Sequence, residues 1–266
     1  MFAASVIISY YKNLPALELI LLSLNNQITE VSFEVILSED DTNNTTVEFI
    51  NQISPLLKYP ITHISLEDKG FNKCICLNRS IKTAKSEFLI FIDGDCIPHK
   101  KFIASYVKHI KTNTVLYGRR VMLSKAISDK ILQLKSYKMI HLFNLIRYRC
   151  KRIEEGIYSP LHNKLSGKKY SGILLGCNMG INKKDIISIN GFDEDYNFPG
   201  GGEDSDIEWR LKKRGNIEFV SLRHLSIIYH LWHVQRFDRE QEIKSTSFMN
   251  QKIKDGIFFC KNGLQK

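Results

Sequence analysis

The sequence predicts an α/β fold in which a mixed, mostly parallel sheet is flanked by helices. Three observations predict it. Short apolar runs of strand length alternate with helical patterns through the first half of the chain. One run, 88–92 (FLIFI), is wholly apolar, as expected for a strand that is buried on both faces of a parallel sheet. Polar and acidic residues follow several runs directly, at the edge where such sheets bind ligands.

The first half, residues 1–122, contains four predicted strands, at 6–9, 34–38, 61–66 and 88–92. Thr45 and Glu48 have the spacing of a capping box, which predicts a helix start there with Val47 turned inward. Pro98 is expected in the first turn of a later helix, because proline is tolerated where the missing N–H would be unpaired.

The second half is less regular. We expect strands at 115–123, 172–181 and 226–233, and helices at 129–149, at 203–214 and in the tail from residue 236. Residues 156–169 are polar with proline and glycine, which predicts a loop that closes over a bound ligand.

Composition limits the class of protein. The chain has 266 residues, 43% hydrophobic and 25% charged, which is typical of a folded globular protein. Its net charge of +10 fits either simple solubility or work beside polyanions, and charge alone does not choose between them. Six cysteines without paired spacing argue against a zinc cluster or disulfides and favour a reducing compartment. Without a signal peptide or a membrane-spanning run, we expect a cytoplasmic protein.

The triplet Asp93-Gly94-Asp95 directly follows the buried run 88–92. Two carboxylates separated by a glycine that allows a sharp turn can face one cation, and hard oxygen ligands suit Mg²⁺ or Mn²⁺. The alternative is an ordinary surface turn, since Asp and Gly are common in turns. The position after a buried strand favours a metal site.

The segment Gly200-Gly201-Gly202-Glu203-Asp204 opens a predicted helix. Glycines let the backbone approach a ligand closely, and a carboxylate here could accept a proton from an attacking hydroxyl. Helix capping alone would also place carboxylates in a first turn, but it does not require two behind a glycine triplet.

Further candidates lie at other strand ends. His230 and His233 could complete a mixed oxygen and nitrogen site that suits Mn²⁺; in an extended run only one would reach the metal. Asp40 and Ser9 could bond a base or ribose. Two more donor-site candidates, Lys73 and Asn78, lie on a helix entering the same crevice.

These segments resemble inverting glycosyltransferases of family 2, which have the GT-A fold, over residues 3–235. The matching parts are the opening at 6–11, the turn at 34–40 and the strand with its acidic end at 88–95. The second half resembles the catalytic segment of chondroitin-polymerase-type enzymes and β-1,4-galactosyltransferases at 176–179, 190–194 and 201–204.

The resemblance implies roles for the candidates. Ser9, Tyr11 and Asp40 would contact the nucleoside, and Lys73, Asn78 and Gly94 would belong to the same donor site. Asp93 and Asp95, with His230 or His233, would hold Mn²⁺ or Mg²⁺ beside the diphosphate. Asp204 would be the catalytic base, and Glu203 with Gly201 and Gly202 would bind the acceptor. A single GT-A domain would span 1–235, with a nucleotide-sugar-binding half at 1–122, a catalytic half at 123–235 and a helical extension at 236–266.

The implied reaction moves a hexose or N-acetylhexosamine from a UDP-sugar to a glycan or lipid-linked oligosaccharide, in bacterial capsule or lipopolysaccharide synthesis. Two alternatives stay open. A sugar nucleotidyltransferase would be expected to carry a glycine-rich loop after the first strand, and 9–13 has none. A basic nucleic-acid-binding protein would use the basic residues of 129–149, but the apolar residues between them favour a core or an anionic membrane surface. We therefore expect no nucleic-acid partner and peripheral contact with the inner face of the plasma membrane.

Overall fold

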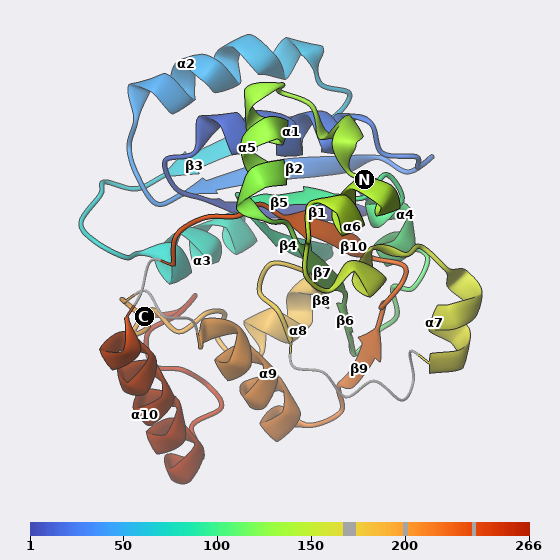
Figure 1. Ribbon diagram of the computed structural model, residues 1–266. Helices are drawn as coiled ribbons and strands as arrows, with labels where there is room; N and C mark the ends of the chain where they lie inside the picture. Colours follow the sequence, from blue (N-terminus) through green and yellow to red (C-terminus); the bar gives the residue numbers. More distant parts are fainter. Residues whose placement is uncertain (167–173, 199–201, 236–237) are drawn as a thin grey trace.

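Strand β1 (Ala4–Tyr10) forms the centre of the molecule because its two faces pack on different hydrophobic clusters. Val6 and Ile8 point into one cluster and Ile7 into the other, as the two-residue period of a strand requires. The computed structural model describes residues 1–166, 174–198, 202–235 and 238–266. Helices cover both faces of the sheet (Figure 1).

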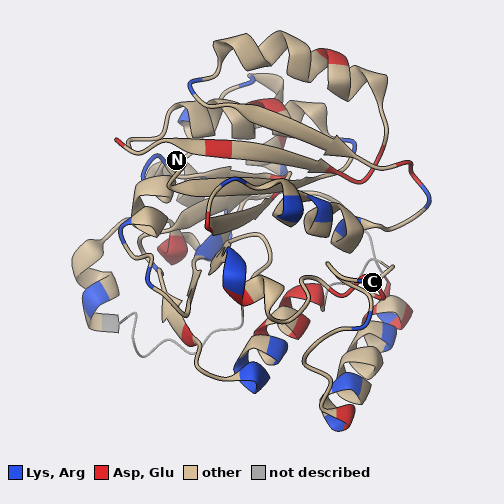
Figure 2. Ribbon diagram, turned by 180° about the vertical axis from the view of Figure 1, so that it is seen from behind, with Lys and Arg blue, Asp and Glu red and all other residues tan. Residues whose placement is uncertain are grey.

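The main sheet has seven strands, and its order confirms the predicted mixed, mostly parallel architecture. In spatial order they are β3 (Ile61–Ser65), β2 (Phe33–Glu39), β1, β4 (Phe88–Asp93), β8 (Met179–Asn182), β6 (Thr114–Tyr117) and β9 (Glu218–Ser221). Only β8 runs antiparallel to its neighbours β4 and β6. The central strands carry few charged residues, whereas α9 and α10 carry many (Figure 2).

A second sheet of three short strands was not predicted. Its order is β5 (Cys96–Pro98), β10 (Ile227–His230) and β7 (Arg119–Met122). Pro98 therefore lies in a strand and not in a helix; it pairs with Ile228 on an edge strand, where a missing N–H is tolerated. The predicted strand 115–123 is two strands in different sheets. They separate at Gly118, where a Cβ would lie 2.3 Å from Ser226 O.

The helices divide between the two hydrophobic clusters. Three helices share a cluster with Val6 and Ile8 of β1: α1 (Leu14–Asn25), α4 (Phe102–Val107) and α5 (Lys125–Gln133). Three others share the cluster of Ile7: α3 (Lys73–Thr83), α8 (Lys183–Ile187) and α9 (Glu203–Arg214). The remaining helices are α2 (Asn44–Ile53), α6 (Leu142–Arg147), α7 (Pro160–Ser166), α10 (Arg239–Asp255) and the 3-10 turns η1 (Ser54–Leu56), η2 (Tyr137–Met139) and η3 (Ile153–Gly156).

Two predicted helix features are wrong. The helix expected at 129–149 is broken into α5, η2 and α6, because Lys135 adopts a left-handed backbone with φ of 47° after the last turn of α5. The cap of α2 is Asn43, whose side chain accepts from Thr45 N, so Thr45 is not the cap. Val47 is consequently 41% exposed and does not turn inward.

The other segments differ from prediction mainly in extent. The expected loop 156–169 contains α7, and its residues 167–169 lie outside the described part. The expected strand 172–181 is reduced to β8, with 172 and 173 outside the described residues, and the strand 226–233 ends at His230. The six cysteines are unpaired. No helix of the described residues is long and apolar enough to cross a membrane.

Candidate active site

A cavity of about 770 Å³ opens at the carboxyl ends of β1 and β4, where open α/β sheets bind ligands. Most of the donor-site and metal candidates line it. Its lining includes Ser9, Tyr11, Asp40, Asp68, Phe71, Lys73, Asp93, Gly94, Asp95, Arg120, Glu203, His230, Trp232 and His233.

The turn Asp93-Gly94-Asp95 is held against β1. Asp93 is the last residue of β4 and pairs with Ser9, and Gly94 N donates to Ser9 O at 2.6 Å. A Cβ on Gly94 would lie 3.0 Å from the same oxygen. A larger residue would push the turn off β1, so the glycine keeps both aspartates at the mouth of the cavity.

Both histidines reach the same carboxylate. His230 Nε2 lies 3.6 Å from Asp95 Oδ1, and His233 Nε2 lies 3.1 Å from Asp95 Oδ2. The expectation that only one would reach the site depended on an extended run, but the strand ends at His230. Burial favours the neutral form of Asp95, yet the two histidines outweigh it and hold the pKa of that carboxyl well below its usual range.

These side chains fit a divalent cation. His233 Nδ1 lies 2.9 Å from Val234 O, an arrangement that places the ring proton on Nδ1 and leaves Nε2 to bind a metal. The Nδ1 atom of His230 is buried without a hydrogen-bond partner, and burial lowers the pKa of that ring, which favours the neutral form that a metal needs. Carboxylate and imidazole together suit Mn²⁺.

Cys96 is not a fitting ligand, although its Sγ lies within 4.8 Å of ligand atoms of Asp95 and His230. Its side chain is fully buried, and burial raises the pKa of the thiol well above its usual value. A protonated thiol binds metal poorly. The Sγ instead donates to Asp95 Oδ1 at 3.2 Å and orients that carboxylate.

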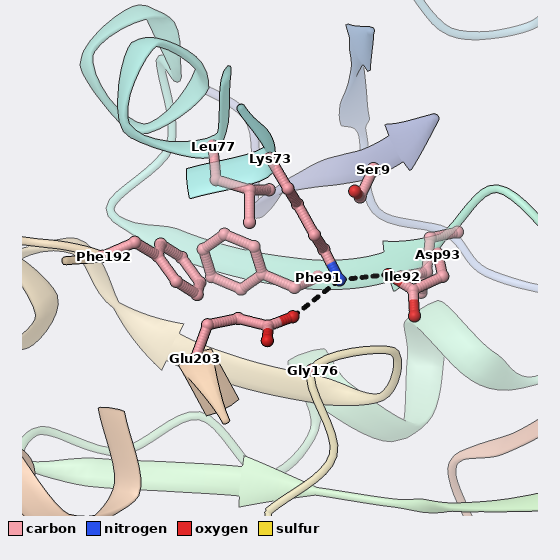
Figure 3. A pocket seen from close by; sticks show the side chains of 9 residues that line it. All are labelled: Ser9, Lys73, Leu77, Phe91, Ile92, Asp93, Gly176, Phe192 and Glu203. Carbon is pink, nitrogen blue, oxygen red and sulfur yellow. Dashed lines mark hydrogen bonds and ion pairs between the residues drawn. The ribbon is translucent and has the colours of Figure 1, made fainter. Parts of the chain in front are cut away.

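Lys73 joins the two acidic segments. Its Nζ lies 3.1 Å from Asp93 Oδ1 and 2.9 Å from Glu203 Oε1 (Figure 3). Burial lowers the pKa of Lys73, but the two carboxylates outweigh burial and raise it well above its usual value. In the same way Lys73 keeps the pKa of the buried Glu203 low. Residues 110 positions apart in the chain therefore meet in one cavity.

Asp204 lies beside this contact. Its Oδ2 accepts from Gly176 N at 3.0 Å and its Oδ1 from Ser205 N at 2.7 Å. Gly176 lines a recess together with Lys73, Asp93 and Glu203. Burial and then the charge of Glu203 raise the pKa of Asp204, which makes it a stronger base than an exposed aspartate.

Of the two acceptor-site glycines, Gly201 lies outside the described residues. Gly202 is the N-cap of α9 with φ of 105°, and a Cβ there would lie 2.2 Å from Ser245 Oγ of α10. The glycine is thus needed for backbone conformation and for the packing of α10. Its contact with an acceptor stays a prediction.

The part of the cavity beside Asp40 suits a nucleoside. Asp40 Oδ2 accepts from Asn72 N at 2.7 Å, whereas its Oδ1 is buried without a hydrogen-bond partner. Burial raises the pKa of Asp40. Ser9 and Tyr11 line the same cavity, and the Tyr11 hydroxyl donates to Asp68 Oδ2 at 3.2 Å.

Asn78 is placed differently from the prediction, because it does not line the cavity. It is buried on α3, and its amide is used in bonds to the backbone of Phe192, at 2.8 and 2.9 Å, and to Glu194 Oε1 at 3.1 Å. A side chain with these partners positions the segment before α9 and is not free for a donor.

Trp232 and Arg120 are among the cavity residues that were not predicted from the sequence. Trp232 lies between the two histidines and is 41% exposed at the cavity, with Lys125 Nζ 5.4 Å from its ring centroid. Its position in the sequence, between His230 and His233, could have indicated that it lies at the site. Arg120 enters from β7, and no motif marks it, because the second sheet that carries it was not predicted.

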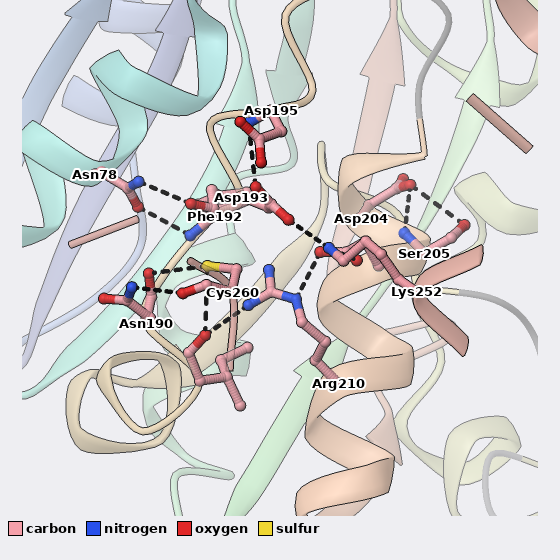
Figure 4. A network of polar contacts seen from close by, with 12 residues as sticks. Asn78, Asn190, Phe192, Asp193, Asp195, Asp204, Ser205, Arg210, Lys252 and Cys260 are labelled. Atoms are coloured by element: carbon pink, nitrogen blue, oxygen red, sulfur yellow. Dashed lines mark hydrogen bonds and ion pairs between the residues drawn. The ribbon is translucent and has the colours of Figure 1, made fainter. Parts of the chain in front are cut away.

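A closed polar network supports α9 from the side of α10 (Figure 4). Lys252 contacts Asp193 Oδ2 at 2.5 Å and also Asp206 on α9. Arg210 donates to Asp206 Oδ2 at 2.6 Å and to Ile189 O at 2.7 Å. The segment after residue 236, expected as an extension, therefore contributes to the support of the acidic helix.

Family models, curated proteins and solved structures match most of the chain. The family model described as "Glycosyl transferase family 2" matches residues 5–169, and "N-terminal domain of galactosyltransferase" matches 158–234. The chain is 22% identical over 240 residues to chondroitin synthase from Escherichia coli, covering 79% of this chain and 32% of that protein. It is 25% identical over 228 residues to hyaluronan synthase from Pasteurella multocida, covering 80% and 23%.

The chain thus spans a third or less of the length of these relatives. Among solved structures, GalNAc-T7 with UDP, GalNAc and Mn²⁺ superimposes with a TM-score of 0.64 at 12% identity, covering 93% of this chain and 48% of that one. This likeness confirms the predicted fold, and the two family matches confirm the resemblance found in the sequence.

Proposed function

The chain belongs to glycosyl transferase family 2, and we propose that it moves a hexose or N-acetylhexosamine from a UDP-sugar to a glycan hydroxyl with inversion at the anomeric carbon. One observation carries the proposal. Asp93, from the end of β4, and Glu203, from the start of α9, share Lys73 and line one cavity beside Asp204. The cavity thus has carboxylates for a cation and for an acceptor.

The donor is expected to lie along the cavity with its nucleoside beside Asp40. Asp40 Oδ1 is the free acceptor that a uracil N–H or a ribose hydroxyl would satisfy, and Ser9 and Tyr11 lie beside it. The diphosphate then falls beside Asp93 and Asp95. GalNAc-T7, of similar fold, is a complex with UDP and Mn²⁺, which supports this choice of nucleotide.

Asp93, Asp95, His230 and His233 would hold Mn²⁺ or Mg²⁺. When bound, such an ion supplies positive charge that stabilises the leaving diphosphate. The oxygen of the acceptor hydroxyl attacks the anomeric carbon while Asp204 accepts the proton of that hydroxyl. The bond from the anomeric carbon to the diphosphate breaks. Glu203, held by Lys73, positions the acceptor.

The product is expected to be a bacterial surface polysaccharide such as a capsule or lipopolysaccharide. Chondroitin synthase and hyaluronan synthase, to which the chain is similar, are named for polysaccharides. The chain matches only part of each of these proteins, so the acceptor and the linkage are to be identified by a transfer assay with defined acceptors.

A panel of sugar nucleotides with Mn²⁺ tests the proposal. We expect one or two UDP-sugars to raise the melting temperature and to release UDP when a glycan acceptor is added. Stabilisation by no sugar nucleotide at millimolar concentration would refute the proposed donor class. Release of pyrophosphate from a nucleoside triphosphate and a sugar phosphate would instead indicate a nucleotidyltransferase.

The segment after β7 supports peripheral contact with an anionic membrane. On α6, Leu142, Phe143 and Ile146 are more than half exposed. Nearby basic residues include Lys130, Lys138, Arg147 and Arg149. Exposed apolar side chains among basic residues are typical of a surface that lies on anionic lipid. The segment adjoins the cavity, because Ser128 Oγ of α5 accepts from Trp232 N at 2.9 Å.

Co-flotation with vesicles containing anionic lipid tests this contact. The double variant Phe143→Ser with Ile146→Ser is expected to lose most of the bound fraction, whereas Leu161→Ser with Leu165→Ser, which changes two exposed leucines of α7, keeps it. Wild-type protein that does not float, or equal binding of all three proteins, would rule out this surface.

A further inference from the structure

Two permanently cationic side chains line the cavity, Lys73 and Arg120, and they differ in their partners. Lys73 is held between two carboxylates. Arg120 has no carboxylate within ion-pair distance among the described residues. Its Nη1 lies 3.5 Å from Cys177 Sγ, and its Nε is buried without a hydrogen-bond partner.

Such a guanidinium is under-satisfied. A thiol is a weak acceptor, and an arginine offers five N–H donors in a planar fork that matches carboxylate or phosphate oxygens. Arg120 is half-buried, and a buried N–H donor without a partner costs free energy, so the unpaired Nε beside a cavity points to a ligand with acceptor oxygens. Within the described part of the chain, Asp93 acts on Arg120 only at a distance longer than that of an ion pair.

The backbone fixes where that anion would lie. Arg120 pairs with Ile228 in the strand that ends at His230, so it enters from the same short sheet as His230. Its sulfur contact, Cys177, follows Gly176, whose N–H holds Asp204 at 3.0 Å. Arg120 therefore lines the cavity together with His230 and contacts the residue that follows Gly176, whose N–H holds the candidate base.

We propose that Arg120 binds the diphosphate of the donor and stabilises it as it leaves; this rests on the proposed function. The anomeric carbon loses its bond to the β-phosphate oxygen, that oxygen keeps the electron pair, the acceptor oxygen forms the new bond, and its proton goes to Asp204. The negative charge that develops on the leaving oxygen is met by the N–H groups of Arg120.

The test compares nucleotides that differ only in phosphates. Dissociation constants for UDP and for uridine are measured by calorimetry with saturating Mn²⁺. In Arg120→Gln we expect UDP to bind about 10- to 100-fold more weakly, the loss typical of a charge-assisted hydrogen bond, and uridine to bind within about twofold of wild type. Arg79→Gln, an exposed arginine on α3, is the matched control and is expected to keep both values.

The variant Arg120→Lys separates a binding effect from a folding defect, because it keeps the positive charge but loses the planar set of N–H donors of the guanidinium. It is expected to weaken UDP binding less than Arg120→Gln does and to leave uridine unchanged. Equal losses for UDP and uridine, or unchanged UDP binding in both variants, would overturn the proposal for Arg120 alone. Wild-type protein that binds no UDP would refute the proposed function as well.

Discussion

Lys73 and Lys252 each join two carboxylates from distant parts of the chain, yet their surroundings differ. Lys73 joins Asp93 to Glu203, lines the cavity and keeps 20% of its side chain exposed. Lys252 joins Asp193 to Asp206 and keeps only 6% of its side chain exposed.

The difference lies in how complete each cluster is. Around Lys252, two cations, with Arg210 as the second, balance two carboxylates, and the cluster is closed to solvent. Around Lys73, carboxylates outnumber cations, and the cavity also holds Asp95 and an unpaired oxygen of Asp40. A balanced, sealed cluster stabilises a fold, whereas an unbalanced one beside a cavity is prepared for a ligand.

The largest expected effect is the loss of transfer in Asp204→Asn. Because the amide cannot accept the proton, kcat is expected to fall about 100- to 10,000-fold, while UDP affinity and melting temperature change little. Asp195→Asn, an exposed carboxylate in the segment before α9, is the matched control and should keep kcat within about twofold. Transfer by Asp204→Asn at near wild-type rate would remove Asp204 as the base.

Lys252→Met is expected to be the most damaging change to stability. It leaves Asp193 and Asp206 buried with Arg210 as their remaining cation, a loss of about 3–5 kcal/mol in the free energy of unfolding. Denaturant titration measures it, with the exposed Lys254→Met on the same helix as control. A loss below about 1 kcal/mol would show that the closed network does not hold α10 to α9.

Lys73→Met sharpens the comparison. Asp93 and Glu203 border a cavity that water enters, so the cost in unfolding free energy is expected to stay near about 1 kcal/mol, well below that of Lys252→Met. The same variant should lose at least about tenfold in kcat/KM, because Glu203 and Asp93 lose their shared position. Equal stability losses for the two lysine variants would contradict the distinction between the clusters.

The smallest expected effect is a shift in pH dependence. Asp204 must be ionised to accept a proton, so the transfer rate rises with pH through its raised pKa. Glu203→Gln removes a negative charge that raises this pKa, and the acid limb of kcat against pH is therefore expected to move to lower pH. The exposed Glu154→Gln should leave the limb in place. A shift to higher pH would contradict the electrostatic coupling of the pair.

The sequence predicted the half of the molecule whose signals are local. The run 88–92 and the acidic turn after it lie in adjacent residues, so the strand, the turn and its place at the sheet edge all followed. The helix at Glu203–Arg214 followed from its acidic first turn and from Gly215.

The second sheet could not be predicted, because each of its strands has three or four residues and its pairing joins Cys96–Pro98 to residues 130 positions away. Arg120 was missed for that reason. The break at Lys135 depends on a left-handed residue that is not glycine. The position of Asn78 away from the cavity could not be predicted, because its amide partners in the segment 192–194 are known only from tertiary structure.

The central claim is that Asp93 and Asp95 hold a cation beside the diphosphate, whereas Asp204 acts only in transfer. The dissociation constant of UDP, measured with and without Mn²⁺, tests this claim most directly. Wild type and Asp204→Asn are both predicted to bind UDP at least about tenfold more tightly with Mn²⁺, and Asp95→Asn is predicted to lose this gain. A gain from Mn²⁺ that persists unchanged in Asp95→Asn, or no gain in wild type, would contradict the account.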